Sequence, residues 1–180
     1  MRTFNLPLSE SERRSLIAGE NILLSGELIT ARDAAHQRLL ETLRKGEVLP
    51  IDLQVATIYY AGPSPTTPGE IIGSIGPTTA GRMDSFMPAF LKAGLRVTIG
   101  KGARNQATKD AMKEVGAVYL GAIGGAGARY ANCVQAVKIL AYEELQSEAI
   151  RLLIVRDFPV TVIIDANGND RYADFVEGVD

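Results

Sequence analysis

The sequence predicts a mixed α/β fold in a single domain, and three observations support this prediction. Short apolar stretches that suit strands alternate with segments whose apolar residues recur at helical spacing. The chain has 180 residues, which is enough to bury one sizeable core. Hydrophobic residues make up 46% of it and charged residues 22%, an ordinary balance for a globular protein. We therefore treat residues 1–180 as one domain with a mixed sheet and flanking helices.

The first part of the chain predicts strands around one helix. Residues 1–18 read as a polar lead-in, and residues 21–29 as a strand in which Gly26 marks a bulge or a turn. Thr30, with Asp33 three positions later, matches a capping box and predicts a helix that starts with Thr30 as its N-cap. Residues 55–61 and 71–75 are expected as strands. The inward face of the helix is expected at Ala35, Leu39, Leu40 and Leu43.

The segment Gly76-Pro-Thr-Thr-Ala-Gly-Arg-Met-Asp84 carries the strongest functional signal. It leads into a predicted helix that Gly94 is placed to end. Free N–H groups at a helix start favour an anion, whereas an arginine in the first turn opposes the helix dipole at about 0.3–1 kcal/mol. The position of Arg82 therefore suggests a shared anionic ligand. The apolar face of this helix is expected at Met83, Phe86, Met87, Phe90 and Leu91.

The second half of the chain predicts a βαβ unit, a glycine-rich loop, a helix and two final strands. The unit comprises a strand at 96–100, a helix at 105–115 and a strand at 117–123. The loop 121–127 does not match the phase of G-x-G-x-x-G, so a dinucleotide site is the weaker interpretation and tight packing explains its glycines equally well. Strands at 152–156 and 160–165 precede a turn at 165–168. The helix after the loop is expected to face inward at Tyr130, Cys133, Val134, Val137 and Ala141.

Arg32 and Lys101 join Arg82 as candidate anion-binding residues. Arg32 falls in the first turn of its predicted helix, as Arg82 does, and the alternative is a solvated arginine at an exposed helix start. Lys101 lies between two glycines at the carboxyl end of a predicted strand, where α/β sheets usually bind ligands. We interpret Lys101 as a contact for a phosphate or a carboxylate.

Three further side chains near these cations carry possible chemistry. His36 is the only histidine and lies four residues after Arg32, so it is either a proton carrier or a histidine packed at the domain surface. Thr78 and Thr79 suit the N-cap position, and nearby cations would favour an ionised hydroxyl. Asp84 lies two residues past Arg82 and either orients it or lies on the surface.

Bulk composition excludes several classes of function. The net charge of −2 and pI of about 5.5 argue against a general nucleic-acid binder. Cys133 is the single cysteine, which excludes a disulfide framework and an all-cysteine metal cage within the chain. The start lacks the apolar core of a signal peptide, and no apolar run approaches the ~20 residues that span a bilayer. We expect a soluble, cytoplasmic protein with no membrane association.

Six motifs follow one another along the chain: Ala31-Arg-Asp-Ala-Ala-His36, Tyr60-Ala-Gly-Pro63, Gly76-Pro-Thr-Thr-Ala-Gly-Arg-Met-Asp-Ser85, Gly100-Lys-Gly102, Tyr119-Leu-Gly-Ala-Ile-Gly-Gly125 and Asp157-Phe-Pro159. Together and in this order they resemble one family, the β subunit or carboxyl-terminal domain of class I iron–sulfur fumarate hydratases and the related L(+)-tartrate dehydratases. The resemblance extends from about residue 10 to residue 172, and the Gly76–Ser85 motif is the most specific.

The resemblance implies a swivelling β/β/α fold and a site shared with a second subunit. In that family an α subunit holds a 4Fe-4S cluster through three cysteines, so this chain resembles the half without the cluster and without a metal site. The substrate-binding residues of the family correspond here to Arg32, Thr78, Arg82 and Lys101, and the residue equivalent to Thr78 is the proposed base. His36 falls within a matching motif and is kept as a second catalytic candidate. The implied assembly is a homodimer or an α2β2 hetero-tetramer.

The implied reaction is the reversible hydration of fumarate to (S)-malate, because two carboxylates need cations and three are available. Two departures from the fumarase pattern bear on the substrate: Gly102-Ala-Arg-Asn-Gln106 after Lys101, and Ala126-Gly-Ala-Arg129 after Gly125. Tartrate or methylfumarate (mesaconate) is the alternative substrate, whereas Ala80-Gly81 favours the fumarase branch. Two other hypotheses remain: a nucleotide-binding oxidoreductase domain built on the 121–127 loop, and a non-catalytic anion-binding or assembly subunit.

Overall fold

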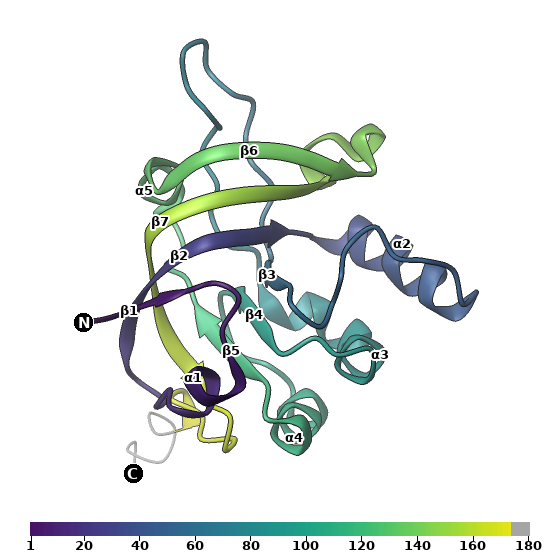
Figure 1. Ribbon diagram of the computed structural model, residues 1–180, viewed down its shortest axis with the longest axis vertical. Coiled ribbons are helices and arrows are strands. Elements are labelled where there is room, and N and C mark those ends of the chain that lie inside the picture. Colours follow the sequence, from purple (N-terminus) through teal and green to yellow (C-terminus); the bar gives the residue numbers. More distant parts are fainter. Residues whose placement is uncertain (174–180) are drawn as a thin grey trace.

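A computed structural model describes residues 1–173 and shows a mixed α/β fold with a seven-stranded sheet, which confirms the predicted fold class (Figure 1). The helical segments are α1 (Glu10–Arg14), α2 (Asp33–Arg44), η1 (Ala80–Phe86, a 3₁₀ helix), α3 (Met87–Lys92), α4 (Gln106–Val115), α5 (Gly127–Asn132) and η2 (Glu143–Glu148, also 3₁₀). The strands are β1 (Arg2–Asn5), β2 (Asn21–Thr30), β3 (Thr57–Tyr59), β4 (Val97–Gly100), β5 (Val118–Gly121), β6 (Val134–Ala141) and β7 (Ile150–Ile164).

The sheet closes on itself. Strands β1 to β5 pair in parallel in their chain order, and β7 pairs antiparallel with both β5 and β2. The strands β2, β3, β4, β5 and β7 therefore form a closed ring, to which β1 and β6 add at the edges. Because parallel strands point the same way, the carboxyl ends of β2 to β5 meet at one edge of this ring.

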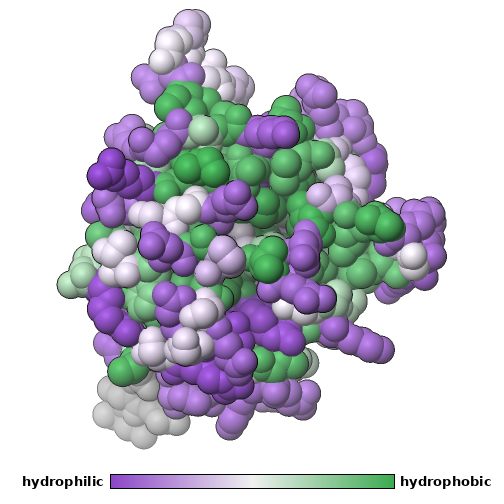
Figure 2. Space-filling model, in the orientation of Figure 1, coloured by the Kyte–Doolittle hydropathy of each residue, from purple (hydrophilic) through white to green (hydrophobic). Residues whose placement is uncertain are grey.

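Two apolar cores lie on opposite faces of the sheet. One core fills the inside of the ring and includes Leu24, Tyr59 and Phe158. The other lies between the sheet and the helices α2, α3 and α4, which cover its outer face, and includes Ile58 and Tyr60 (Figure 1). Successive residues of β3 thus point into different cores, as the alternation of side chains along a strand requires. Figure 2 shows that apolar residues also gather on the surface that carries β6 and β7.

Most predicted elements are confirmed. Gly26 lies at a bulge in β2 with φ of 116°, and Gly94, with φ of 111°, directly follows the end of α3. Asn105 caps α4 through its side chain, and Gly116 ends that helix in the left-handed conformation. The predicted inward residues of α2 are buried or partly buried, and the turn at 165–168 is present.

Three predictions about the first half of the chain are wrong. Residues 1–18, expected as a polar lead-in, contain β1 and α1. Their apolar residues Phe4, Leu6 and Leu16 are buried in the core. Thr30 is the last residue of β2, not an N-cap, because its backbone pairs with Tyr59 of β3. Residues 71–75 form bends, not a strand.

The largest error concerns residues 134–141, which form β6 where a helix was expected. Val134 and Val137 are spaced for a helix face, but this segment pairs along its length with β7, so strand pairing outweighs the local periodicity. In the same way, the two strands expected at 152–156 and 160–165 are a single strand, β7, that continues through Asp157 at a positive φ of 52°.

Candidate functional site

The candidate residues lie where the parallel strands end. Arg32 follows β2, Lys101 follows β4, and Gly124 belongs to the loop after β5. The segment that follows β3 pairs with residues 77–78, since Ala61 and Pro77 form an isolated bridge. The candidate residues therefore lie in segments that directly follow, or pair with, neighbouring strands of the ring.

Main-chain hydrogen bonds fix Thr78 beside Lys101. Thr78 N donates to Tyr60 O at 2.6 Å, and Lys101 N donates to Thr78 O at 3.2 Å. Ala80 N donates in turn to Lys101 O at 2.8 Å, so η1 begins against the loop after β4. A Cβ atom at Gly124 would lie 3.7 Å from Lys101 Nζ, which places the lysine head over the loop after β5. The backbone thus sets the relative position of the hydroxyl and the amine.

The side chains of Thr78 and Lys101 have free polar atoms. Within residues 1–173, neither the Thr78 hydroxyl nor the Lys101 amine forms a hydrogen bond, and Lys101 forms no ion pair. Thr78 is nevertheless buried, with 9% of its surface exposed, whereas Lys101 is exposed. Thr79 stands at the N-cap of η1, but its hydroxyl makes no capping bond. Of these two threonines, Thr79 therefore occupies the predicted N-cap position, but it does so without a capping hydrogen bond.

Asp33 connects the two candidate arginines. Arg82 Nε donates to Asp33 Oδ1 at 2.9 Å, and Arg32 Nε lies 3.8 Å from Asp33 Oδ2. Arg82 N also donates to Thr79 O at 3.3 Å, so the same turn carries Thr79 and Arg82. The structure therefore brings Arg32 and Arg82 to one carboxylate, a residue that sequence reasoning treated only as part of a capping box.

Glu148 reaches the same region from η2. Its Oε2 accepts from Ala34 N at 2.7 Å, which caps the start of α2, and its Oε1 lies 3.6 Å from Arg32 Nη2. The turn before it is strained, because Gln146 has φ of 54° and ψ of −112°. Arg151 holds this turn by donating to Gln146 O at 2.7 Å. Nothing local in the sequence indicates Glu148, since it meets α2 only through the fold.

Arg32 remains only loosely paired. Its Nε is buried without a hydrogen-bond partner within residues 1–173, and its two ion-pair contacts are 3.6 Å and 3.8 Å long. It occupies the N-cap of α2 without capping it. A cation at a helix start is disfavoured by the dipole, so an incoming anion that accepts from the guanidinium would relieve this position.

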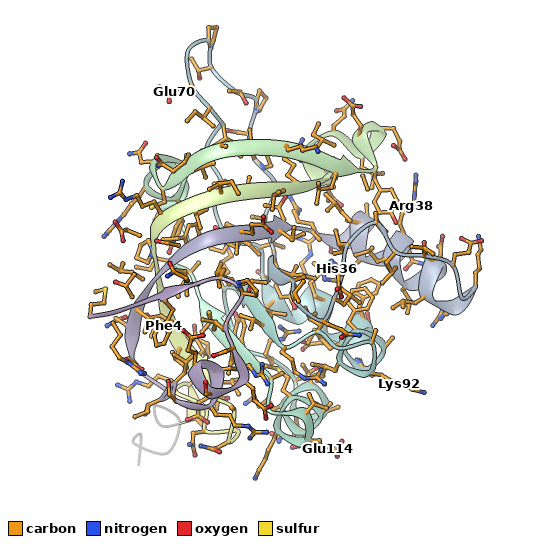
Figure 3. The ribbon with its side chains drawn as sticks, viewed as in Figure 1. Phe4, His36, Arg38, Glu70, Lys92 and Glu114 are labelled. Carbon is orange, nitrogen blue, oxygen red and sulfur yellow. The ribbon has the colours of Figure 1, made fainter. Side chains whose placement is uncertain are left out.

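His36 lies inside the protein, between α2 and the sheet, and is not at the domain surface (Figure 3). Its Nδ1 donates to Arg32 O at 2.8 Å, and its ring packs against those of Tyr60, Phe86 and Phe90. Burial lowers the pKa of His36 to about 4, so the imidazole is neutral near pH 7. The contact with Arg32 O lets His36 fix the backbone of that arginine.

Asp84 does not orient Arg82 and does not lie on the surface. Its Oδ1 accepts from Arg104 Nε at 2.6 Å, and both side chains are buried. Although burial lowers the pKa of Arg104, the Tyr60 hydroxyl and the Asp84 carboxylate outweigh it, and the pKa is raised. Sequence reasoning missed Arg104. The only available signal was its place close to Lys101 in a predicted ligand-binding loop.

The described residues contain no metal site of their own. Residues 1–173 include no group of three or more His, Cys, Asp or Glu side chains that could hold a metal ion. Cys133 follows α5, where it is partly buried and packs against the inner core. An iron–sulfur cluster therefore does not fit the part of this chain that the structure describes.

The glycine loop after β5 is explained by close packing at one position. A Cβ at Gly127 would lie 2.3 Å from Ser74 Oγ and 2.9 Å from Gly76 N. Any side chain there would push residues 74–76 away from α5. The requirement for glycine at this position thus needs no nucleotide.

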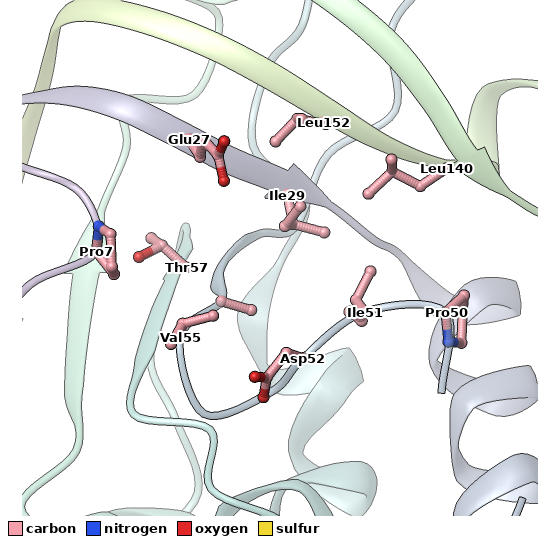
Figure 4. A pocket seen from close by; sticks show the side chains of 11 residues that line it. Pro7, Glu27, Ile29, Pro50, Ile51, Asp52, Val55, Thr57, Leu140 and Leu152 are labelled. Atoms are coloured by element: carbon pink, nitrogen blue, oxygen red, sulfur yellow. The ribbon is translucent and has the colours of Figure 1, made fainter. Parts of the chain in front are cut away.

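A cavity of about 250 Å³ lies between β2 and residues 50–57, and its lining is apolar and acidic (Figure 4). Apolar side chains such as Ile51 and Leu140 line it, together with the carboxylates of Glu27 and Asp52 and no cation. A dicarboxylate would meet repulsion there. The loops after β2 and β4 and the start of η1, which together carry three cations, are the better anion site. The described residues also include no helix long and apolar enough to cross a membrane.

Fold and site together define an α/β domain that presents positive charge and a free hydroxyl at the carboxyl ends of its strands. Residues 3–175 match the family model described as Fumarase C-terminus, and the chain belongs to this family. "Fumarate hydratase 2" of Leishmania major is 44% identical over 157 residues, which cover 86% of this chain and 28% of that protein. The class I aerobic fumarate hydratase of Salmonella typhimurium is 40% identical over 170 residues, which cover 92% of this chain and 29% of that protein. The chain therefore spans little more than a quarter of the length of either relative.

A third relative matches over almost its whole length. The "Putative L(+)-tartrate dehydratase subunit beta" of Methanocaldococcus jannaschii is 36% identical over 176 residues, which cover 94% of this chain and 90% of that protein. The family that the sequence motifs indicated is thereby confirmed.

Proposed function

We propose that this chain is the β subunit of a two-subunit cytoplasmic hydro-lyase that reversibly hydrates fumarate to (S)-malate. The observation that supports the proposal is that Asp33 contacts both Arg32 and Arg82, while backbone hydrogen bonds hold Thr78 beside Lys101 at the same edge of the sheet. Family membership supports the reaction class, since relatives bear the name fumarate hydratase.

The three cations would bind the two carboxylates of the substrate. Arg32 has a buried Nε without a partner, and Lys101 has a free amine, so each can donate to an incoming oxygen. A charge-assisted hydrogen bond contributes about 1.5–3 kcal/mol. Asp33 already holds Arg82 through Nε, which leaves the other guanidinium nitrogens to face the ligand. The net positive charge of the cluster favours a dianion over a neutral compound.

Thr78 would exchange the proton at C3 of malate. Thr78 is nearly buried, its hydroxyl has no hydrogen-bond partner within residues 1–173, and its backbone is held at both N and O. Neighbouring cations favour the ionised form of an acidic group. They would also stabilise the negative charge that builds on the carboxylate next to C3 when the proton leaves. His36, neutral and buried, would act by fixing Arg32, with proton transfer by its free Nε2 as the alternative role.

A partner would complete the site. The described residues hold no metal site, and the resemblance assigns a 4Fe-4S cluster to an α subunit. The relative named as a β subunit is matched over 90% of its length, which supports a separate chain of this size. The proposed assembly is an α2β2 hetero-tetramer, or a homodimer of the combined unit, with the site at the subunit interface. This chain's part is to bind the diacid and to move the proton.

The test is anaerobic reconstitution. The chain is purified alone and together with its iron-loaded α subunit, and the hydration of fumarate and mesaconate and the dehydration of tartrate are followed for each. We expect no turnover by the chain alone and turnover by the complex, fastest with fumarate. Preference for tartrate, which the name of one relative favours, would change the substrate but not the site. Sustained turnover by the isolated chain would contradict the shared site.

Two other hypotheses have separate tests. Calorimetry with nicotinamide and flavin cofactors should show no binding, because packing accounts for Gly127 in the glycine loop. A non-catalytic assembly role predicts that alanine at Arg32 or Lys101 leaves the activity of the complex intact. We expect both substitutions to reduce it strongly, because each removes a charged contact to the substrate.

A further inference from the structure

We propose that the buried ion pair between Asp84 and Arg104 is a positioning device that sets the spacing between the turn bearing Arg82 and the loop bearing Lys101. This inference rests on the proposed function, since it concerns the same site. Neither residue has a free face toward a ligand, because the Asp84 side chain is 5% exposed and the Arg104 side chain is not exposed at all.

The pair joins two segments that carry site residues. Asp84 belongs to η1, two positions after Arg82, and Arg104 lies in the loop three positions after Lys101. Asp84 Oδ1 accepts from Arg104 Nε at 2.6 Å, and Asp84 Oδ2 accepts from Asn105 N at 2.8 Å. Both oxygens of one carboxylate thus bind the loop after β4 at successive residues.

The guanidinium of Arg104 reaches a third site segment. Its Nη1 donates to the Tyr60 hydroxyl at 3.1 Å, and its carbon lies 5.3 Å from the centre of the Tyr60 ring. The carbonyl of Tyr60 is the group that accepts from Thr78 N, so this contact bears on the backbone of the proposed base. A Cβ at Gly100 would lie only 2.8 Å from Tyr60 Cδ2, which shows how closely the ring abuts β4.

Tyr119 encloses the guanidinium from another strand. The carbon of the guanidinium lies 5.2 Å from the centre of the Tyr119 ring, and the Tyr119 hydroxyl donates to Gly102 O at 2.8 Å. Gly102 directly follows Lys101 and has φ of 76°. The cluster of Asp84, Arg104, Tyr60 and Tyr119 therefore contacts the backbone of Thr78 and of the residue after Lys101, and its member Asp84 lies in η1 two positions after Arg82.

Stability alone does not explain an arginine here. A buried ion pair is weak evidence for stability, because apolar side chains of similar volume often serve as well or better. Arg104 also leaves its Nη2 buried without a partner within residues 1–173, which is a cost. What an apolar pair cannot supply is a directional contact between η1 and the loop after β4. Directional contacts of this kind matter where a misplacement of about 1 Å can reduce catalysis about 100-fold.

The experiment compares three variants in the assembled enzyme. Arg104→Lys keeps the charge but loses the planar fork. Asp84→Asn removes the charge of the partner, and the double variant Asp84→Asn with Arg104→Met removes the pair without leaving a lone buried charge. We expect each to lower kcat/KM by about tenfold or more, with the larger part in kcat. The double variant should unfold at a temperature near that of the wild type and still be slow.

Arg13→Lys is the matched control, since Arg13 is a buried arginine that donates to Gly116 O at 2.8 Å at the other end of the molecule. We expect it to lose stability but keep kcat and KM. If activity falls in step with stability in all variants, the control included, the pair is only structural and the proposal is wrong. Wild-type kinetics in Arg104→Lys or in the double variant would also overturn it.

An activity-independent measurement separates this proposal from the proposed function. In amide NMR spectra of the full chain, the double variant should shift the signals of Thr79 and Lys101 and leave those of β1 and β6 unchanged. If the wild-type complex hydrates no dicarboxylate but these shifts occur, the proposed function fails and the positioning stands. Unchanged signals at both residues would overturn the positioning, whatever the activity of the wild type.

Discussion

Arg32, at the end of the ring where the parallel strands finish, is bonded very differently from two arginines at the opposite end. At the end where the parallel strands begin, Arg13 Nε donates to Gly116 O at 2.8 Å, and Arg96 Nη1 donates to Leu91 O and Leu95 O at 2.8 Å each. At the end where the strands finish, Arg32 has a buried Nε that forms no hydrogen bond within residues 1–173 and lies 3.8 Å from Asp33 Oδ2.

The polarity of the neighbouring helices explains the difference. Gly116 and Leu91 lie at the carboxyl ends of α4 and α3, where the helix dipole attracts a cation and carbonyl groups are free. Arg32 stands at the amino end of α2, where the dipole repels it. Arginines of the first kind stabilise the fold, and we propose a bound anion as the reason for an arginine of the second kind. The following predictions test this contrast, from the largest expected effect to the smallest.

Thr78→Ala should give the largest loss, because it removes the proposed base at the strand-finishing end. General-base catalysis contributes about 10²–10⁴-fold, so we expect kcat to fall by about 10³-fold. The dissociation constant of the substrate should change much less, because the three cations remain. Steady-state kinetics together with equilibrium binding to the complex measure both quantities. Equal damage to the two would demote Thr78 from base to binding residue.

Arg82→Ala should lower kcat/KM of the complex by about 10²-fold or more, since a charged contact of about 3 kcal/mol corresponds to that factor. The comparison variant is Arg96→Lys at the other end of the ring, which keeps a donor near Leu91 O and should change only the melting temperature. Near-normal kinetics in Arg82→Ala would remove Arg82 from the site. A kinetic defect in Arg96→Lys would erase the contrast between the two ends.

His36 predicts a smaller effect, on the pH dependence of stability. Burial holds its folded pKa at about 4, below an unfolded value of about 6.5, so the unfolded chain binds the proton first as pH falls. The contribution of His36 to the free energy of unfolding is therefore fully present above its unfolded pKa and is lost as the pH falls toward its folded pKa. Between pH 7 and pH 5 the loss should be about 2 kcal/mol in chemical denaturation.

His36→Gln is the reference variant for this measurement, because it cannot titrate and still offers a donor to Arg32 O. Between pH 7 and pH 5, the free energy of unfolding of this variant should fall by ~2 kcal/mol less than that of the wild type. Parallel curves for the two proteins would contradict a neutral buried imidazole. The kcat profile of the complex should keep its shape in this variant if His36 positions Arg32, and should lose a limb if His36 carries the proton.

Local sequence signals predicted what local chemistry determines. The unit β4–α4–β5 follows from its periodicity and from Asn105 and Gly116 at the ends of its helix. The four proposed substrate contacts followed from helix starts and strand ends, which are also local. The failure at β6 has a different cause, since residues 134–141 become a strand only because β7 lies beside them.

The missed residues of the site share this non-local origin. Glu148 meets Arg32 across more than a hundred residues of chain, and Asp84 meets Arg104 across α3 and β4. No spacing rule pairs such residues, because the fold alone brings them together. The resemblance to a family supplied the chemistry, but not these partners.

The closure of the strand ring by β7 has a consequence for how the site moves. β7 pairs with both β2 and β5, which are the outermost of the strands that carry the site (Figure 1). Neither strand therefore has a free edge at which it could separate from the sheet. Amide hydrogens near Arg32, Thr78 and Lys101 should therefore exchange with solvent in one concerted opening, not in separate local events.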